Sequence, residues 1–195
     1  MSATKFLDKL LDGVTVEWLP LGEIAIIYGG LTGKSKADFE GGNARFVPYK
    51  NIFDNKSVDF ESLLFVKILD SENQNKVKYG DVLFTGSSET ADEVGISSSI
   101  INNLTEDVYL NSFSFGVRFK ENTPIIPNFS KYLFRSKMLR SQIIKTASGV
   151  TRFNISKERF RKIKIPIPCP ENPKKSLDIQ VKIAKILETS GRFYF

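Results

Sequence analysis

The most regular alternation of apolar and polar residues lies in the stretch NSFSFGVRFK, residues 111–120. Successive side chains of a β-strand point to opposite faces, so a period of two residues predicts a half-buried strand. The predicted inward face carries Phe113, Phe115, Val117 and Phe119, and the other face carries Ser112, Ser114, Gly116 and Arg118.

Four other stretches predict further extended structure. DVLFTG (81–86) and GISSSI (95–100) are predicted strands on either side of the polar loop SSETADEV. VEWLPLGEIAIIYGG (16–30) is predicted to be an extended lead-in and a strand, because a proline and a glycine within it disfavour a helix. ARFVPYKNI (44–52) is predicted to be another short extended piece.

A helical period begins near residue 126. In IPNFSKYLFRSKMLRSQIIKTASG (126–149), apolar residues recur at the 3.6-residue spacing of one helix face. Asn128 is the predicted N-cap and Gly149 the predicted end, which makes a single helix. Its opposite, solvent-facing side is predicted to carry Lys131, Arg135 and Lys145.

The ends of the chain complete the predicted fold. Ser156 is predicted to cap one helical turn, KERFRK, which leads into the extended, proline-rich IKIPIPCP. TKFLDKLL (4–11) and SLDIQVKIAKILETSG (176–191) are predicted to be short helices. Short strands with few helices indicate an α+β fold, with one domain over 1–170 and a linker and helix over 171–195.

The composition excludes several kinds of chemistry. The chain has 195 residues, 41% hydrophobic and 26% charged, which suits one soluble domain. It has no histidine and one cysteine, so a structural zinc site and the usual Ser-His and Cys-His catalytic pairs are excluded. No apolar run is long enough to cross a bilayer, and MSATKFLDKLLDG lacks the apolar core of a secretory signal. We therefore expect a cytoplasmic protein with no catalytic residue, no metal site and no membrane partner.

The net charge of +6 is unevenly distributed. Residues 131–164 contain eleven Lys or Arg and a single acidic residue, Glu158, whereas the rest of the chain has a net charge of −4. A basic segment on a mildly acidic body is typical of a nucleic-acid-binding face, although a solvated lysine-rich helix face gives the same pattern.

The stretch YGGLTGKSK (28–36) is similar to a nucleotide-binding phosphate loop but has the wrong spacing. The P-loop pattern requires a glycine, four further residues and then Gly-Lys-Ser, and the glycine's position holds Tyr28. KADFEGGNARF, which follows, contains two adjacent glycines that would end a helix early. An ATPase is therefore disfavoured, and Lys34 and Lys36 are predicted to contact a phosphate other than that of ATP.

Five segments, in one order along the chain, together resemble the specificity (S) subunit of type I restriction-modification enzymes. They are VEWLPLGEIA, VKYGDVLFTGSSETADEVG, YLNSFSFGVRF, SGVTRFNISKERFRKIKIPIPCP and DIQVKIAKIL. The resemblance covers most of the chain, from about residue 14 to residue 188.

This resemblance implies a DNA target recognition domain over 1–170 that reads one half of a bipartite double-stranded site. In the family, the subunit has no chemistry of its own. It positions a methyltransferase (modification) subunit, which uses S-adenosylmethionine, and a restriction (motor-nuclease) subunit, which uses ATP with Mg²⁺. The resemblance therefore implies no cofactor in this chain, those two subunits as partners, and a role in DNA methylation and host defence.

Compared with the family pattern, the sequence is expected to hold one half of a subunit, as a natural half-subunit, a truncated gene product or an excised domain. A full subunit resembles two such halves in tandem, with two long helices packed as a spacer, whereas the helix here stops at ETSGRFYF within 171–195. We expect apolar residues of this truncated helix to be exposed and to bind a partner, either in a weak homodimer or on the methyltransferase subunit. These residues are Ile179, Ile183 and Ile186.

Candidate DNA contacts are side chains that bind phosphates or base edges. Arginine can pair with guanine and asparagine with adenine, so Arg152 and Asn154 in SGVTRFN are candidates, unless Arg152 is only solvated. The other candidates are Lys34, Lys36, Arg45, Ser87, Ser88, Thr90, Lys157, Arg159, Lys162 and Lys164. Acidic residues in TGSSETADE would repel phosphate, which favours a structural role for that loop. Lys162 and Lys164 are predicted to share one face of an extended segment.

Two other functions stay open at the level of sequence. A nonspecific RNA or single-strand binder would interleave aromatic and basic residues on exposed strands, and only Phe153 and Phe160 lie within the basic segment. An interaction module without nucleic acid is the other alternative.

Overall fold

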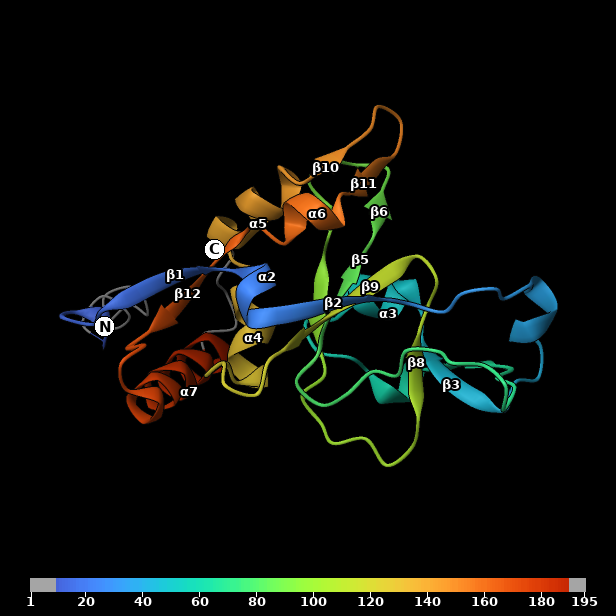
Figure 1. The fold of residues 1–195 in the computed structure, drawn as a ribbon, viewed down its shortest axis with the longest axis horizontal. Coiled ribbons are helices and arrows are strands. Elements are labelled where there is room, and N and C mark those ends of the chain that lie inside the picture. Colours follow the sequence, from blue (N-terminus) through green and yellow to red (C-terminus); the bar gives the residue numbers. More distant parts are fainter. Residues whose placement is uncertain (1–9, 190–195) are drawn as a thin grey trace.

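The computed structural model describes residues 10–189, and the α+β fold is confirmed (Figure 1). A central antiparallel sheet runs in the order β2 (Ala25–Gly29), β9 (Ser114–Phe119), β5 (Val82–Thr85) and β7 (Ser97–Ser99). The two strands predicted on either side of the polar loop are β5 and β7, which pair with each other. Within the described part of the chain, no helix is long and apolar enough to cross a bilayer.

The predicted strand is confirmed as β9, but it is not half-buried, because Ser114 and Gly116 on its other face are buried as well. Phe115 and Val117 are buried in the main hydrophobic core, and Phe119 packs against this core. Phe113, by contrast, precedes the strand and is exposed. The strand therefore begins later than the period-2 pattern predicts. The backbone from Asn111 to Ser114 forms a tight turn, in which the amide of Phe113 donates to the side chain of Asn111.

The extended segment 16–30 is interrupted by a helical turn, α2 (Leu21–Ile24), so the prediction that a helix is absent was wrong. The segment forms β1 (Val16–Pro20), which pairs with β12 (Lys164–Pro168), and then β2 in the central sheet. The amides of Leu21 and Gly22 would be unsatisfied at the start of a short helix. They donate to the carbonyls of Ile163 and Arg161 instead, so tertiary contacts override local propensity.

The single helix predicted over 128–149 is wrong. The chain forms α4 (Pro127–Leu133) and α5 (Lys137–Ile144), with Ile126 rather than Asn128 at the N-cap position of α4. The hydroxyl of Ser136 accepts from the amide of Leu139 and caps α5. Ser136 thus starts a second helix within the apolar period, which continues across the break and conceals it from sequence analysis.

Arg135 lies at this break and points into the protein, contrary to its predicted solvent position. Its guanidinium donates to the carbonyl of Ser97 at 2.7 Å. It also donates to the carbonyls of Ile52, Phe53 and Asn55 at 2.8–3.1 Å. These three carbonyls end the helix α3 (Tyr49–Asp54), where no intrahelical donor remains. Arg135 therefore caps the C-terminus of α3.

Two further cations of the basic segment are also internal. Arg140 donates to the carbonyls of Asp92, Val94 and Gly95 at 2.6–2.9 Å. Lys131 is buried and pairs with Glu188, so its predicted solvent position was wrong as well. Three of the eleven cations counted in residues 131–164 thus hold the fold together rather than charge its surface.

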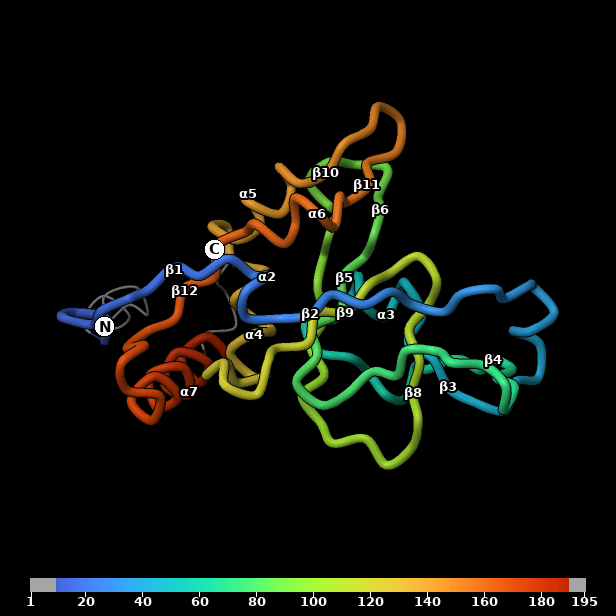
Figure 2. Tube along the Cα trace, in the orientation of Figure 1, coloured from blue at the N-terminus to red at the C-terminus, as the bar shows by residue number. Residues whose placement is uncertain are grey.

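A second lobe extends from the central sheet as an arm, at the right in Figure 2. Its sheet places β3 (Ala44–Val47) between β4 (Leu64–Val66), antiparallel, and β8 (Val108–Leu110), parallel. Two 3₁₀ turns complete the arm, Lys36–Phe39 and Phe60–Ser62. The extended prediction for 44–52 holds only up to Val47, because α3 begins after Pro48, whose fixed φ suits a helix entry.

The last helix is α7 (Pro173–Thr189), which packs against α4 and β12. Ile179 and Ile183 belong to the main core, so the expectation that they are exposed was wrong. Gln180 joins α7 to the segment that precedes α4, since its side chain accepts from the amide of Ile126 and donates to the carbonyl of Pro124. Ile186 is half-buried. The helix predicted over residues 4–11 lies largely outside the described residues.

Candidate nucleic-acid interface

A small three-stranded sheet projects from the molecule at the top of Figure 1. It consists of β10 (Ala147–Ser148), β11 (Phe153–Ile155) and β6 (Ser87–Ser88), in that order and all antiparallel. The turn 149–152 closes the β10–β11 hairpin and forms its outermost part. We call these three strands and the turn the projecting sheet.

The conformation of this turn requires a glycine at position 149. Its φ of 145° is a conformation that other residues rarely adopt. A Cβ atom there would lie 1.9 Å from the carbonyl oxygen of Arg152. The next residue, Val150, is 91% exposed. The hairpin therefore holds its side chains in a defined arrangement toward a binding partner.

Four of the predicted DNA contacts are brought together on the projecting sheet. Arg152 donates from Nε to the hydroxyl of Ser87 at 3.1 Å, and Asn154 donates to the carbonyl of Arg152 at 3.2 Å. Arg152 and Asn154 are exposed, and among the described residues nothing bonds the terminal guanidinium nitrogens of Arg152. Ser87 and Ser88 are buried, so their side chains support the sheet rather than face solvent.

Tyr49 connects the projecting sheet to α3, and sequence analysis missed it. Its hydroxyl donates to the carbonyl of Ser87 at 2.8 Å. Partial burial raises the pKa of Tyr49, which keeps the hydroxyl protonated and able to donate. Tyr49 is the first residue of α3, a helix that its local sequence did not predict.

Two further cations of the basic segment lie on the short helix that follows β11. Ser156 accepts from the amide of Arg159 and caps α6 (Lys157–Phe160), as predicted. Arg159 donates to the hydroxyl of Ser148, while the ammonium of Lys157 lies 6.0 Å from the ring centre of Phe115. Lys162 and Lys164 are exposed, and the isoleucines that alternate with them are buried, which confirms the predicted shared face.

The polar loop after β5 contains a local hydrogen-bond network. The hydroxyl of Thr90 donates to Glu93, and its amide donates to the hydroxyl of Ser88. Both contacts shape the loop, which agrees with the favoured structural interpretation of this segment.

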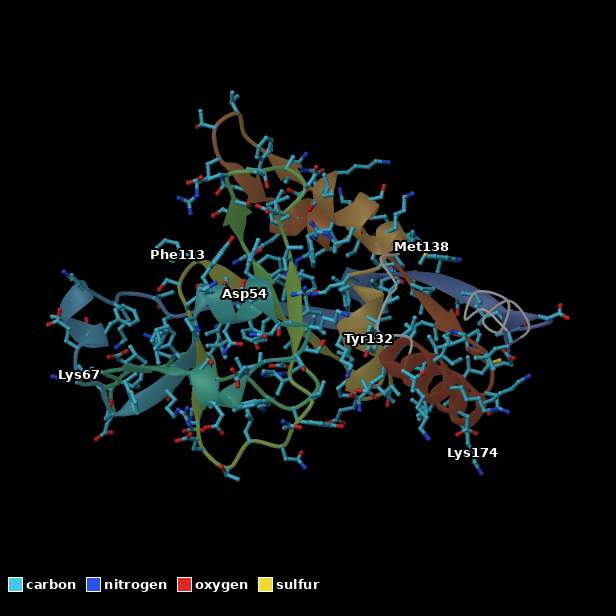
Figure 3. All side chains as sticks on the ribbon, turned by 180° about the vertical axis from the view of Figure 1, so that it is seen from behind. Asp54, Lys67, Phe113, Tyr132, Met138 and Lys174 are labelled. Carbon is cyan, nitrogen blue, oxygen red and sulfur yellow. The ribbon has the colours of Figure 1, made fainter. Side chains whose placement is uncertain are left out.

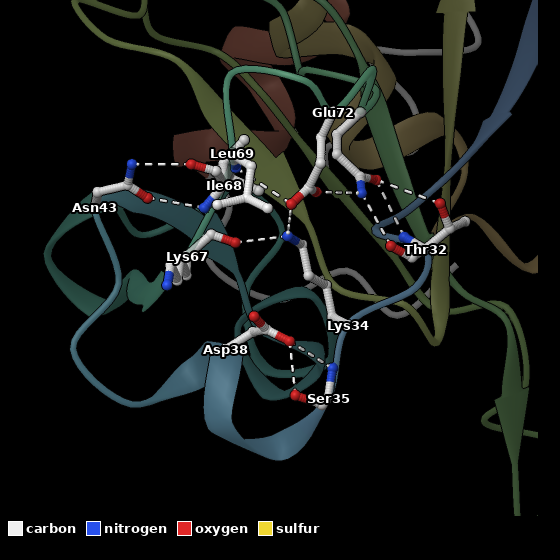
Figure 4. A network of polar contacts seen from close by, with 10 residues as sticks. Thr32, Lys34, Ser35, Asp38, Asn43, Lys67, Ile68, Leu69 and Glu72 are labelled. Atoms are coloured by element: carbon white, nitrogen blue, oxygen red, sulfur yellow. Dashed lines mark hydrogen bonds and ion pairs between the residues drawn. The ribbon is translucent and has the colours of Figure 1, made fainter.

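Lys34 is internal to the arm and does not face solvent (Figure 4). Its side chain is 3% exposed, and its ammonium donates to Glu72 at 2.5 Å and to the carbonyl of Lys67 at 2.6 Å. These contacts hold the pKa of the Glu72 carboxyl below its usual value. With these partners Lys34 cross-links two loops and cannot reach a phosphate, which corrects its predicted role. Lys36, two residues on, is exposed.

Arg45 is also engaged within the arm. It donates to the carbonyl of Phe60 at 2.7 Å and pairs with Glu106 at 3.3 Å. Lys34 and Arg45 therefore lie apart from the Arg152 cluster, and the structure unites only the candidates of β6, β11 and α6.

An apolar groove of about 790 Å³ lies at the end of the molecule opposite the arm. β1, α4, α5, β12 and α7 all contribute side chains to it. Its lining includes Trp18, Tyr132, Met138, Pro166, Ile183 and Leu187. Of the predicted partner-binding residues, Ile183 reaches this groove.

These features define a class of protein: a two-lobed α+β domain that presents arginine, asparagine and lysine side chains on a projecting hairpin. A family model described as the type I restriction modification DNA specificity domain matches residues 14–193. The chain belongs to this family.

The relatives agree with this assignment. The chain is 26% identical to the Escherichia coli type I restriction enzyme EcoprrI specificity subunit, covering 96% of this chain and 45% of that protein. It is 28% identical to the Escherichia coli EcoR124I/EcoR124II specificity subunit, covering 96% of this chain and 41% of that protein. The chain thus spans less than half the length of these curated relatives.

The fold has solved counterparts. A chain from the structure of a type I restriction-modification system, solved to explain its assembly and conformational transition, superposes with a TM-score of 0.60. It is 17% identical and covers 97% of this chain and 45% of that chain, so this similarity shows the fold.

Proposed function

We propose that this chain binds double-stranded DNA sequence-specifically, as one target recognition domain of a type I specificity subunit. The projecting sheet carries this proposal, because Arg152 and Asn154 are exposed beside a fixed turn. Both side chains can form paired hydrogen bonds with base edges in the major groove. Lys157 and Arg159 lie beside them and supply charge for phosphates.

The same proposal assigns the partners. The domain reads one half of a bipartite site and positions a methyltransferase subunit and a restriction subunit in the cytoplasm. The chemistry belongs to those subunits, with S-adenosylmethionine, ATP and Mg²⁺, whereas this chain supplies recognition. Selection from random duplexes, with the methyltransferase subunit present, tests the proposal and identifies the half-site.

Duplex binding should weaken steeply with salt. Contact with about five phosphates releases counterions and gives a slope near −4.5 in a plot of log affinity against log salt concentration. Fluorescence anisotropy with an end-labelled duplex measures this slope. A slope near zero would remove the nucleic-acid proposal and favour an interaction module.

Arg152→Ala should lower the affinity for the selected site by about 1–3 kcal/mol and relax the preference at one base pair. The reason is that a base contact discriminates between sequences, whereas a phosphate contact does not. Lys162→Ala is the matched control, because this side chain is 75% exposed and lies outside the hairpin. The control should weaken all duplexes alike.

Selections with both variants, run in parallel with the unmodified protein, measure this difference. Equal weakening of every sequence by Arg152→Ala would make Arg152 a phosphate contact only.

A further inference from the structure

Phe113 is the most exposed aromatic side chain among the described residues. It is 68% exposed, compared with 55% for Phe65 on the arm. Figure 3 shows it on the side of the molecule between the projecting sheet and the arm. Burying a phenylalanine ring stabilises a fold, and this ring forgoes most of that contribution.

The backbone of Phe113 is fixed by hydrogen bonds at both its amide and its carbonyl. Its amide donates to the side chain of Asn111, and its carbonyl accepts from the amide of Gly86 at 2.9 Å. Gly86 leads into β6 of the projecting sheet, and a Cβ atom there would lie 2.7 Å from the Phe113 carbonyl oxygen. Asn111 is buried and donates to the carbonyl of Val47, where β3 of the arm ends. These hydrogen bonds fix the backbone position from which the Phe113 ring projects.

The surroundings of Phe113 suit a nucleic acid. Gly86, which donates to the carbonyl of Phe113, immediately precedes Ser87, and the hydroxyl of Ser87 accepts from Nε of Arg152. The ammonium of Lys157 lies over Phe115, two residues along the chain. The exposed ring of Phe113 therefore lies on a turn that is hydrogen-bonded to the segment leading into the projecting sheet.

We propose that Phe113 is a wedge that enters the duplex at one base step, unstacks it and bends the DNA. This inference rests on the proposed function. Apolar side chains inserted between base pairs kink a duplex by about 20–90°. Pyrimidine–purine steps unstack most readily, so the wedge adds a preference for such a step within the half-site.

Duplex bending tests the wedge directly. The probe is the duplex obtained by selection, labelled with a fluorescent donor and acceptor at its two ends and carrying 2-aminopurine at successive positions. Binding of the unmodified protein should raise energy transfer between the ends and brighten 2-aminopurine at one step. Phe113→Ala should abolish both signals and weaken binding about tenfold, while the salt slope is unchanged.

Phe65→Ala is the matched control, since it removes a comparably exposed ring from the arm and should leave both signals intact. Thermal unfolding should be alike for both variants, because neither ring is buried. Bending and 2-aminopurine emission that persist in Phe113→Ala would overturn the wedge while leaving DNA binding in place. Absence of salt-dependent binding by the unmodified protein would instead refute the proposed function itself.

Discussion

Phe84→Ala should lower the free energy of unfolding by about 3–5 kcal/mol, the usual loss when a buried aromatic ring is removed. Phe84 is fully buried at the centre of a cluster of four phenylalanines. Its ring centre lies 5.3 Å from Phe115, 5.1 Å from Phe134 and 5.0 Å from Phe160. The neighbours come from the central sheet, the end of α4 and α6, so one cavity would loosen three elements together.

Urea unfolding followed by far-ultraviolet circular dichroism measures this loss. Phe84→Leu should recover a large part of it, because leucine fills much of the cavity. Phe39→Ala, at a partly exposed ring on the arm, should cost much less. A small effect of Phe84→Ala would mean that the cluster collapses around the cavity and does not join the three elements rigidly.

Arg135→Met should also lower the free energy of unfolding by about 3–5 kcal/mol, because four carbonyls would lose a charged donor at once. Three of them end α3, and the fourth belongs to Ser97 in β7. Burial lowers the pKa of Arg135 to about 10, which shows that its charge is kept from water at some cost. Methionine keeps the apolar stem but offers no donor to these oxygens.

Lys137→Met is the matched control for Arg135→Met, because it removes the same charge two residues away at an exposed position. It should change the unfolding free energy by less than about 0.5 kcal/mol. The two variants also separate structure from DNA binding. A reduced salt slope in Arg135→Met protein that remains folded would show that this guanidinium reaches phosphate after all.

Local patterns in the sequence predicted the elements whose signals lie within a few residues. β9 has a strict period of two, and Ser156 caps α6 with a hydrogen bond three residues along the chain. The face shared by Lys162 and Lys164 follows from alternation in the same way. In each case the partner that fixes the structure is a chain neighbour.

The failed predictions concern side chains whose partners are distant in sequence. Arg135 binds carbonyls about 40 to 80 residues away, and backbone oxygens leave no trace in a charge pattern. Lys34 similarly binds Glu72, 38 residues on. Residue type and spacing alone suggested surface cations in both cases. Tertiary structure decided which cations are engaged within the fold, and among the described residues it left the terminal guanidinium nitrogens of Arg152 unbonded.

The candidate site divides in the same manner. Arg152 and Asn154 were predicted from their chemistry, because arginine and asparagine pair with bases. Tyr49 and Phe113 were missed, since the first lies in an unpredicted helix and the second was assigned to the inward face of a strand. The Asn-Ser pair before Phe113 is a turn signal that could have shown that the strand begins only after Phe113.

The apolar groove contains a spectroscopic probe. Trp18 is the only tryptophan in the chain, it lines the groove, and it is 42% exposed. Its emission therefore reports the polarity of this one surface without any label. A macromolecule that covers the groove would shift that emission to shorter wavelength. The projecting sheet carries no tryptophan, so a shift of this emission reports occupancy of the groove and not of the projecting sheet.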